Sequence, residues 1–175
     1  WRRYIWCMKS RFIAPMAGDD LLNSLLLANP RSIPFIVDEE VLEQWRHSPQ
    51  HMTWILSQMA KQKLLEKCQQ VLKRVQTQHL EVTSVHFNCV LSACARTRDW
   101  PTALVILEDM DQLQVNRDAI SFSSAVKACE SWTMALSLLK WMEGQLKLDN
   151  IAMNTLISSC ETFGCWDVAL DLLKK

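Results

Sequence analysis

The chain holds a few groups of residues whose types could support metal or acid–base chemistry, and none of these groups is complete. His79-Leu-Glu81 matches the His-x-Glu half of a zinc deaminase site, but the Pro-Cys-x-x-Cys half is absent. His47 and His51 are four residues apart, yet Pro49 between them breaks the helix that would place both on one face. No Cys-x-x-Cys pair and no glycine-rich phosphate loop occurs. We therefore expect no catalytic residue, no metal and no cofactor.

The first 18 residues combine basic and aromatic side chains and contain no acidic residue. Such a mixture suits contact with a phosphate backbone and stacked bases. The alternative is a tail whose aromatic rings pack on a neighbouring surface. The basic residues are Arg2, Arg3, Lys9 and Arg11, and Lys61 and Lys63 would extend the same surface. The whole chain has 19 Lys plus Arg and 19 Asp plus Glu, so its net charge gives no general attraction for a polyanion.

A tandem repeat organises the larger part of the chain. The segment Trp100-Pro-Thr-Ala-Leu recurs as Trp132-Thr-Met-Ala-Leu and Trp166-Asp-Val-Ala-Leu, and each copy begins an apolar run at helical spacing. A second matched segment precedes each copy. Two amphipathic helices joined by a tight turn, repeated in tandem, predict an all-α solenoid of helical hairpins.

The repeat divides the chain into units of about 35 residues. Residues 50–84 form a degenerate unit, 85–119 a second, 120–150 a shortened third and 151–175 a partial fourth. The residues predicted to fill the core between hairpins are Trp100, Trp132, Trp166, Ala103, Ala135 and Ala169. Cysteines recur near the ends of the first helices, at Cys94, Cys129 and Cys160. A small buried hydrophobe recurs in this way, so we expect free thiols and a reducing compartment.

Residues 1–49 show no repeat and are predicted to form an extension with short helices. Asp19 and Asp20 precede an apolar helix over 21–28, residues 31–34 form a linker between two prolines, and acidic residues 38–40 open a helix through residue 45. Pro49 ends that helix. No apolar run is long enough to cross a membrane. The chain opens with Trp rather than Met, which would fit a processed chain.

Polar residues directly before the repeat helices are predicted N-caps. Asp118, and Asp149 with Asn150, precede first helices, and Asp99 and Ser131 precede second helices. A side-chain oxygen at such a position can accept a hydrogen bond from a free backbone N–H group of the first turn.

The matched segments resemble the pentatricopeptide repeat. The resemblance rests on Val85-x-Phe-Asn, the Ala-Leu of each second helix, Met110 and an aspartate that closes the unit. The tetratricopeptide repeat differs in its period of about 34 residues. The resemblance is strong over 85–175, weaker over 50–84 and absent before that. It implies a right-handed superhelix of hairpins in a mitochondrial or plastid protein, and such arrays usually bind single-stranded RNA along the groove lined by their first helices.

In that family, the fifth residue of the first helix and the last residue of the unit select the base. With units that begin at residues 50, 85 and 120, the pairs are Trp54 with Ser84, Cys89 with Ala119 and Ser124 with Asn150, while Thr155 has no partner. Only Ser124 with Asn150 resembles a recognised pair, one for adenine. The second residues, which flank the base, are His86, Ser121 and Ala152, where the family prefers aliphatic side chains. With this register, the array is predicted to discriminate poorly between RNA sequences.

The charge of the repeats gives the same prediction. Between residues 85 and 149 the chain carries six basic and eight acidic residues, a net charge of −2, which opposes phosphate binding. Only the degenerate unit is basic, with Lys61, Lys63, Lys67, Lys73 and Arg74 against Glu66 and Glu81.

The residues and the resemblance together predict a non-catalytic subunit of an organellar ribonucleoprotein, such as a ribosome or an RNA-processing assembly. We expect other protein subunits and single-stranded or ribosomal RNA as partners, and no small-molecule substrate. The alternative is a purely protein-binding scaffold on an organellar membrane energy-converting complex. Trp141, which has no equivalent in the other repeats, is the candidate contact for a protein partner.

Overall fold

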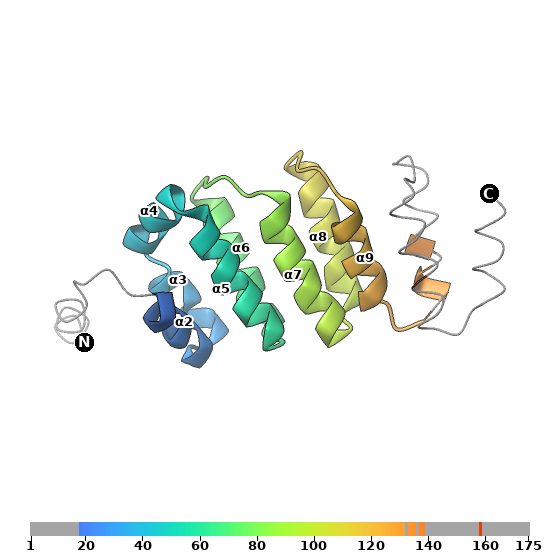
Figure 1. Cartoon of the computed structure of the whole chain (residues 1–175), viewed down its shortest axis with the longest axis horizontal. Coiled ribbons are helices and arrows are strands. Elements are labelled where there is room, and N and C mark those ends of the chain that lie inside the picture. Colours follow the sequence, from blue (N-terminus) through green and yellow to red (C-terminus); the bar gives the residue numbers. More distant parts are fainter. Residues whose placement is uncertain (1–17, 132, 136, 139–157, 159–175) are drawn as a thin grey trace.

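The computed structural model describes residues 18–131, 133–135, 137–138 and 158. All regular elements in these residues are helices, and the repeat helices stack side by side as a row of hairpins (Figure 1). The predicted all-α stack of hairpins is confirmed.

The extension forms helices α2 (Gly18–Leu27), η1 (Pro30–Ser32), α3 (Ile33–Ile36) and α4 (Glu39–His47). Two predictions for it were wrong. Asp19 and Asp20 do not precede α2 but lie in its first turn, where the helix dipole favours acidic residues. Residues 31–34 are not a linker, because each proline begins a helical turn, where its missing N–H group is not needed.

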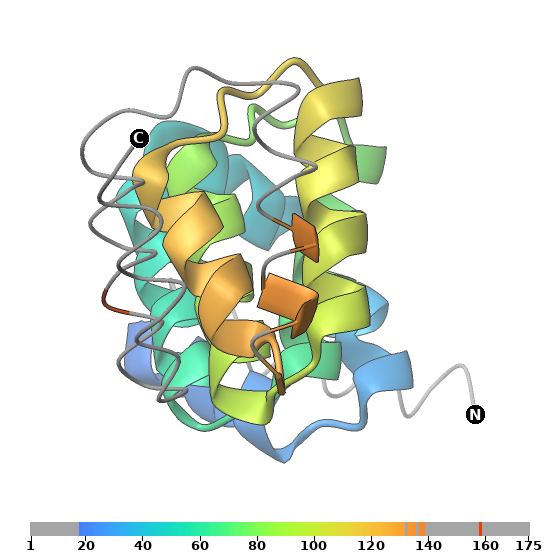
Figure 2. The same cartoon turned by 90° about the vertical axis from the view of Figure 1, so that its right-hand side faces the viewer.

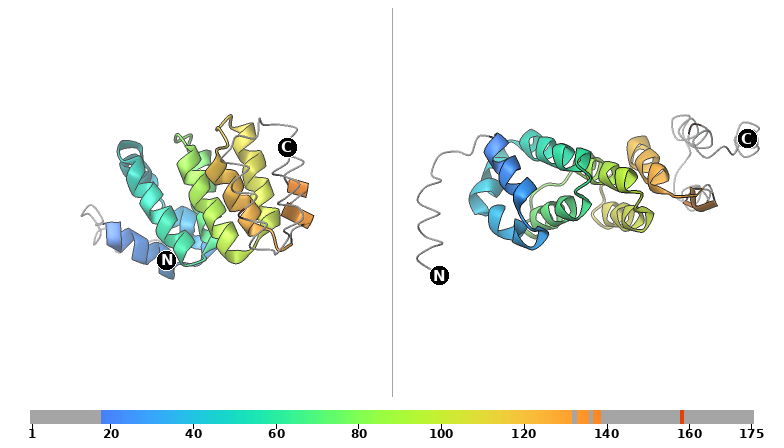
Figure 3. Two further views of the ribbon diagram at one scale, coloured as in Figure 1. Left: turned by 45° about the vertical axis from the view of Figure 1, so that its right-hand side comes forward. Right: turned by 90° about the horizontal axis from the view of Figure 1, so that it is seen from below.

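The repeats form the hairpins α5 (Pro49–Lys61) with α6 (Leu65–Thr77) and α7 (Ser84–Thr97) with α8 (Trp100–Gln112), followed by α9 (Ala119–Ala128). Helix α7 packs against both α5 and α9. These three helices form one layer, which we call the first-helix layer, and α6 and α8 form the second-helix layer (Figure 3). Seen from the end of the row, α9 and α8 lie on opposite sides (Figure 2).

The predicted N-caps Asp99, Asp118 and Ser131 are confirmed by their hydrogen bonds, whereas Asp149 and Asn150 lie outside the described residues. Asp99 accepts from the Thr102 N–H at 3.1 Å, and Asp118 accepts from the Ser121 N–H at 2.8 Å. The Ser131 hydroxyl accepts from the Met134 N–H at 3.4 Å, and Asp38 caps α4 in the same way. Each bond joins residues three positions apart, which is why the sequence alone could locate the helix starts.

The core lies between the two layers. Each first helix buries one apolar stripe: α5 buries Met52, Ile55, Leu56 and Met59, and α7 buries the residues 35 positions later, Phe87, Val90, Leu91 and Cys94. Cys94 and Cys129 are both buried free thiols, and burial raises their pKa values to about 12 and about 11. A disulfide between these two repeat cysteines is absent, as the repeat pattern predicted.

The predicted Trp–Ala column is only partly a buried core. Ala103 and Ala135 are buried, but Trp100 is half-buried at the start of α8. Trp100 packs against the core cluster, but its burial is partial rather than complete. Trp132, Trp166, Ala169 and Cys160 lie outside the described residues.

Two basic residues of α6 attach the extension to the first hairpin. The Lys67 ammonium is buried and donates to the carbonyls of Leu25 and Leu26 at the end of α2, and the Arg74 guanidinium donates to the carbonyl of Val37. Cations stabilise the carbonyl-rich end of a helix. Lys67 and Arg74 thus bind this chain's own carbonyls, which removes both from the basic surface predicted for the degenerate unit.

Candidate nucleic-acid interface

The three helices of the first-helix layer contain no acidic residue. Helices α5, α7 and α9 each carry one Lys or Arg, and it lies in the last turn: Lys61, Arg96 and Lys127. All three side chains are exposed. The ion pairs within the described residues are Arg46–Glu43 and Arg117–Asp111, so these three cations have no carboxylate partner there.

The helix ends bring these cations to one edge of the layer. Helices α5, α7 and α9 run in the same direction, and their C-terminal ends lie together at the lower edge in Figure 1. Lys61, Arg96 and Lys127 therefore form a row with one cation per repeat. Each of the three cations also stabilises the C-terminal end of its own helix, but that role does not require the three to lie at the same edge of the layer.

Acidic residues gather instead on α8, one of the two helices of the second-helix layer; the other, α6, carries Glu66 against three basic residues. Helix α8 carries Glu108, Asp109 and Asp111 and no basic residue. Burial raises the pKa of Asp109 above its usual value, although the nearby Lys73 opposes the shift. The net charge of −2 predicted for residues 85–149 thus does not describe the first-helix layer, whose helices carry basic residues and no acidic ones. Counting charges helix by helix would have revealed from the sequence that the first helices lack acidic residues.

Trp54 is a partly exposed aromatic residue on the same stripe of α5 as Lys61. The two are seven residues apart, which is two helical turns. The indole is 37% exposed and lies parallel to the imidazole of His51, with ring centroids 6.1 Å apart. A cation and an aromatic ring on one helix face are the components of a single-strand binding surface.

The junction between α7 and α9 is a network of three side chains. The Asn88 amide donates to both carboxylate oxygens of Asp118, at 3.1 and 3.2 Å. The buried Ser121 hydroxyl lies 2.7 Å from the amide oxygen of Asn88 and 3.0 Å from Asp118 Oδ1. Asn88 and Asp118 therefore face each other across successive first helices.

This junction changes the register of the repeats. Helices α7 and α9 begin at Ser84 and Ala119, one residue before the predicted unit starts. Counted from these starts, the fifth residue of α7 is Asn88, and the last residue of its unit is Asp118. The aliphatic second residues are Val85 and Ile120, which are 52% and 61% exposed. The sequence signal for this register is Phe87-Asn88 itself, because a unit that starts at Val85 makes Asn88 the fourth residue rather than the fifth.

The residues that the earlier register put beside the base have other partners. The Cys89 thiol is half-buried and points to the carbonyl of Thr53 on α5 at 3.8 Å. His86 is buried, its Nδ1 accepts from the Thr83 N–H at 3.1 Å, and it makes a further hydrogen bond to the Pro49 backbone. Burial lowers the pKa of His86 below its ordinary value. Neither side chain is free to flank or read a base in this arrangement.

The other sequence-predicted contact residues divide into two groups. Lys61 and Lys63 are exposed, and Lys63 has a left-handed backbone (φ 60°) that ends α5; Ser124 is half-buried on α9. The structure thus places Lys61, but not Lys63, in the last turn of a first helix. The contacts predicted outside the described residues are Arg2, Arg3, Lys9, Arg11, Trp141, Asn150 and Thr155.

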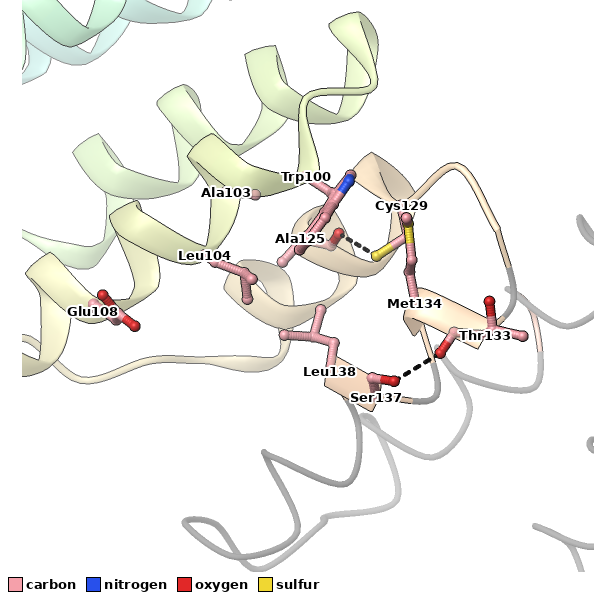
Figure 4. Close-up of a pocket in the computed structure, with 10 residues that line it drawn as sticks. All are labelled: Trp100, Ala103, Leu104, Glu108, Ala125, Cys129, Thr133, Met134, Ser137 and Leu138. Carbon is pink, nitrogen blue, oxygen red and sulfur yellow. Dashed lines mark hydrogen bonds between the residues drawn. The ribbon is translucent and has the colours of Figure 1, made fainter.

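A cavity of about 480 Å³ lies between α8, α9 and the residues Thr133, Met134, Ser137 and Leu138, with Trp100 in its wall (Figure 4). Its lining is mostly apolar, and the polar groups are Glu108, Cys129 and two hydroxyls. The Cys129 thiol already donates to the Ala125 carbonyl at 3.5 Å. This lining contains no acid–base pair, so the cavity does not suggest a reaction.

Within the described segments, no group of three or more His, Cys, Asp or Glu side chains is arranged to hold a metal ion. His47 ends α4 and His51 lies in α5, so the two are on separate helices, as the intervening proline predicted. A helix with the length and apolarity to span a bilayer is also absent from the described part.

Comparison with known proteins identifies the repeat. A family model for pentatricopeptide repeat-containing proteins matches residues 52–175. A pentatricopeptide repeat-containing protein of Arabidopsis thaliana is 28% identical over 92 residues, which is 51% of this chain and 17% of that protein. The crystal structure of the pentatricopeptide repeat protein PPR10 from maize is similar, with a TM-score of 0.61 and 15% identity over 98% of this chain and 30% of that chain. This chain thus spans less than a third of either relative.

Proposed function

Because the chain belongs to the pentatricopeptide repeat family, whose members are generally non-catalytic RNA-binding proteins, we propose that it binds single-stranded RNA along its first-helix layer. It would do so as a subunit of an organellar ribonucleoprotein, in a mitochondrion or plastid, without catalysing a reaction.

The observation that supports this proposal best is the absence of acidic residues from the helices of the first-helix layer. Lys61, Arg96 and Lys127 lie along one edge of a layer whose helices contain no acidic residue. A phosphate backbone that follows this edge would meet one cation per repeat and release the counterions bound to it. The acidic helix α8 lies in the other layer and would not repel the strand at close range.

The same layer offers groups for bases above the phosphate row. The Asn88–Asp118 pair supplies hydrogen-bonding groups at the junction of α7 and α9. The partly exposed Trp54 supplies a ring for stacking at α5, where the corresponding pair would be Thr53 with Thr83. We infer that the α7–α9 junction reads a base and that α5 binds one without selecting it.

Neutralising the cation row tests the proposal. The variant Lys61→Gln/Arg96→Gln/Lys127→Gln is titrated with a random-sequence single-stranded RNA oligonucleotide at several salt concentrations. If each cation contacts one phosphate, the slope of log K against log salt should fall by about 0.7 per residue, or about 2 for the three. Affinity should decrease for every RNA sequence alike, since phosphate contacts carry no sequence information.

The matched control removes three exposed cations that lie outside the first-helix layer: Arg31→Gln/Arg46→Gln/Lys73→Gln. Both variants change the net charge by the same amount. Equal loss of binding in both would show that only overall charge matters. Full binding by the first variant would refute the proposed surface.

Two apolar side chains of the extension favour the protein-binding scaffold as a second candidate function. Leu27 is 89% exposed and Phe35 is 85% exposed. Apolar side chains as exposed as these suit a protein contact. If the scaffold reading holds, Leu27→Ser/Phe35→Ser should release a partner protein from the native complex, and the triple glutamine variant should retain it.

A further inference from the structure

The orientation of the Asn88 amide is fixed by the chemistry of its two neighbours. A carboxylate only accepts hydrogen bonds, so the amide nitrogen of Asn88 must be the atom that faces Asp118. The amide oxygen then faces Ser121, whose hydroxyl must donate across 2.7 Å. Ser121 and Asp118 together therefore determine which way the amide points.

Burial and a backbone hydrogen bond fix the position of Ser121. Its side chain is fully buried, and its hydroxyl oxygen also accepts from the Asp118 N–H at 3.3 Å. The single hydroxyl proton of Ser121 faces two acceptors, the amide oxygen of Asn88 at 2.7 Å and Asp118 Oδ1 at 3.0 Å, and the shorter contact is the one to Asn88. The two oxygens of one carboxylate are close enough to share one amide hydrogen, which leaves the second amide hydrogen and one carbonyl lone pair of Asn88 for a ligand.

The preceding junction lacks this arrangement, which gives an internal comparison. Thr53 replaces Asn88, and its hydroxyl donates to the Pro49 carbonyl of its own helix at 3.1 Å. His86 replaces Ser121 and bonds to Thr83 and Pro49. The cross-repeat network is thus built at the α7–α9 junction and not at the α5–α7 junction.

We propose that Ser121 is a positioning residue for nucleobase recognition: it fixes the amide of Asn88 so that one donor and one acceptor meet the edge of a base. The expected ligand is a nucleobase that presents a hydrogen-bond acceptor next to a hydrogen-bond donor on one edge. Because Ser121 belongs to α9, the unit that contains Asn88 reads a base only when the next repeat is docked. This inference rests on the proposed RNA binding.

The test uses the 175-residue chain with Ser121→Ala and two independent measurements. The first is the pair of side-chain amide proton signals of Asn88, identified by their loss in Asn88→Ala. They should shift and exchange faster with water, because the amide loses one of its two anchors. The second is binding to oligouridylate, oligoadenylate and oligocytidylate. The ratio of the weakest to the tightest dissociation constant should fall about 5-fold, the effect of one net hydrogen bond.

Asp99→Ala is the control, because it removes a helix cap from α8 without touching Asn88. If it changes the base ratio or the Asn88 signals as much as Ser121→Ala does, the role of Ser121 is only structural and the inference is refuted. If the parent chain binds none of the three oligonucleotides, the proposed function fails. The Asn88 signals then decide the inference alone: a change in Ser121→Ala supports the positioning, and no change overturns it.

Discussion

Replacing Lys67 with methionine should loosen the extension from the first hairpin. The ammonium donates to two carbonyls at the end of α2, at 3.2 and 2.5 Å, and the side chain is only 9% exposed. Methionine retains much of the apolar stem but cannot donate. The variant Lys67→Met therefore leaves the carbonyls of Leu25 and Leu26 without this partner.

The size of the effect follows from two opposing terms. Hydrogen bonds from a charged donor contribute about 1.5–3 kcal/mol each, while removing a buried charge recovers part of its desolvation cost. We expect a net loss of about 1–3 kcal/mol, less than the sum of two such bonds. Since neighbouring elements of a solenoid separate locally, the loss should appear as opening of α2.

Hydrogen exchange of the α2 amides is the direct assay. Opening of α2 should become about 5- to 150-fold more frequent, whereas amides in the core of α7 should change little. Lys73→Met is the matched control, because Lys73 is exposed on the same helix. Unchanged exchange in α2, or an equal effect of both substitutions, would refute the assignment of Lys67 as the attachment point.

Two further predictions concern packing and pH. Phe87→Ala should lower the free energy of unfolding, measured in urea, by about 3–5 kcal/mol, because Phe87 is fully buried. Trp100→Ala should lower it by less than about 3 kcal/mol, because Trp100 is only half-buried. Equal losses in the two variants would contradict this packing. Because burial lowers the pKa of His86, the unfolded chain binds the proton more readily than the folded chain. The contribution of His86 to stability should therefore be complete above about pH 6.5 and should be lost as the pH falls through the lower pKa that His86 has in the folded chain. His86→Gln should flatten this dependence, which urea unfolding midpoints measured from about pH 7.5 to about pH 5 would show.

The groups that we propose to face RNA show how a one-residue error in the repeat register changes which residues are assigned to the base. Placing the unit start at Val85 rather than Ser84 selects Cys89 as the fifth residue, which the structure turns toward α5. The one-residue shift selects Asn88 and Asp118 and brings the exposed Val85 and Ile120 to the second position. Helix starts are difficult to fix from sequence to better than a residue or two, and this function depends on a single residue.

The sequence alone determined most of the local structure of the repeats. The apolar stripes and the caps at Asp99 and Asp118 depend on residues within a few positions of one another, and the repeat period follows from the recurrence of these patterns, so spacing was sufficient to predict them. Tertiary structure decided what the polar side chains do. Lys67 meets carbonyls about 40 positions earlier in the chain, and Asn88 meets Asp118 30 positions later. Such partners are set by how successive hairpins stack, and local periodicity carries no information about which polar side chains that stacking brings together.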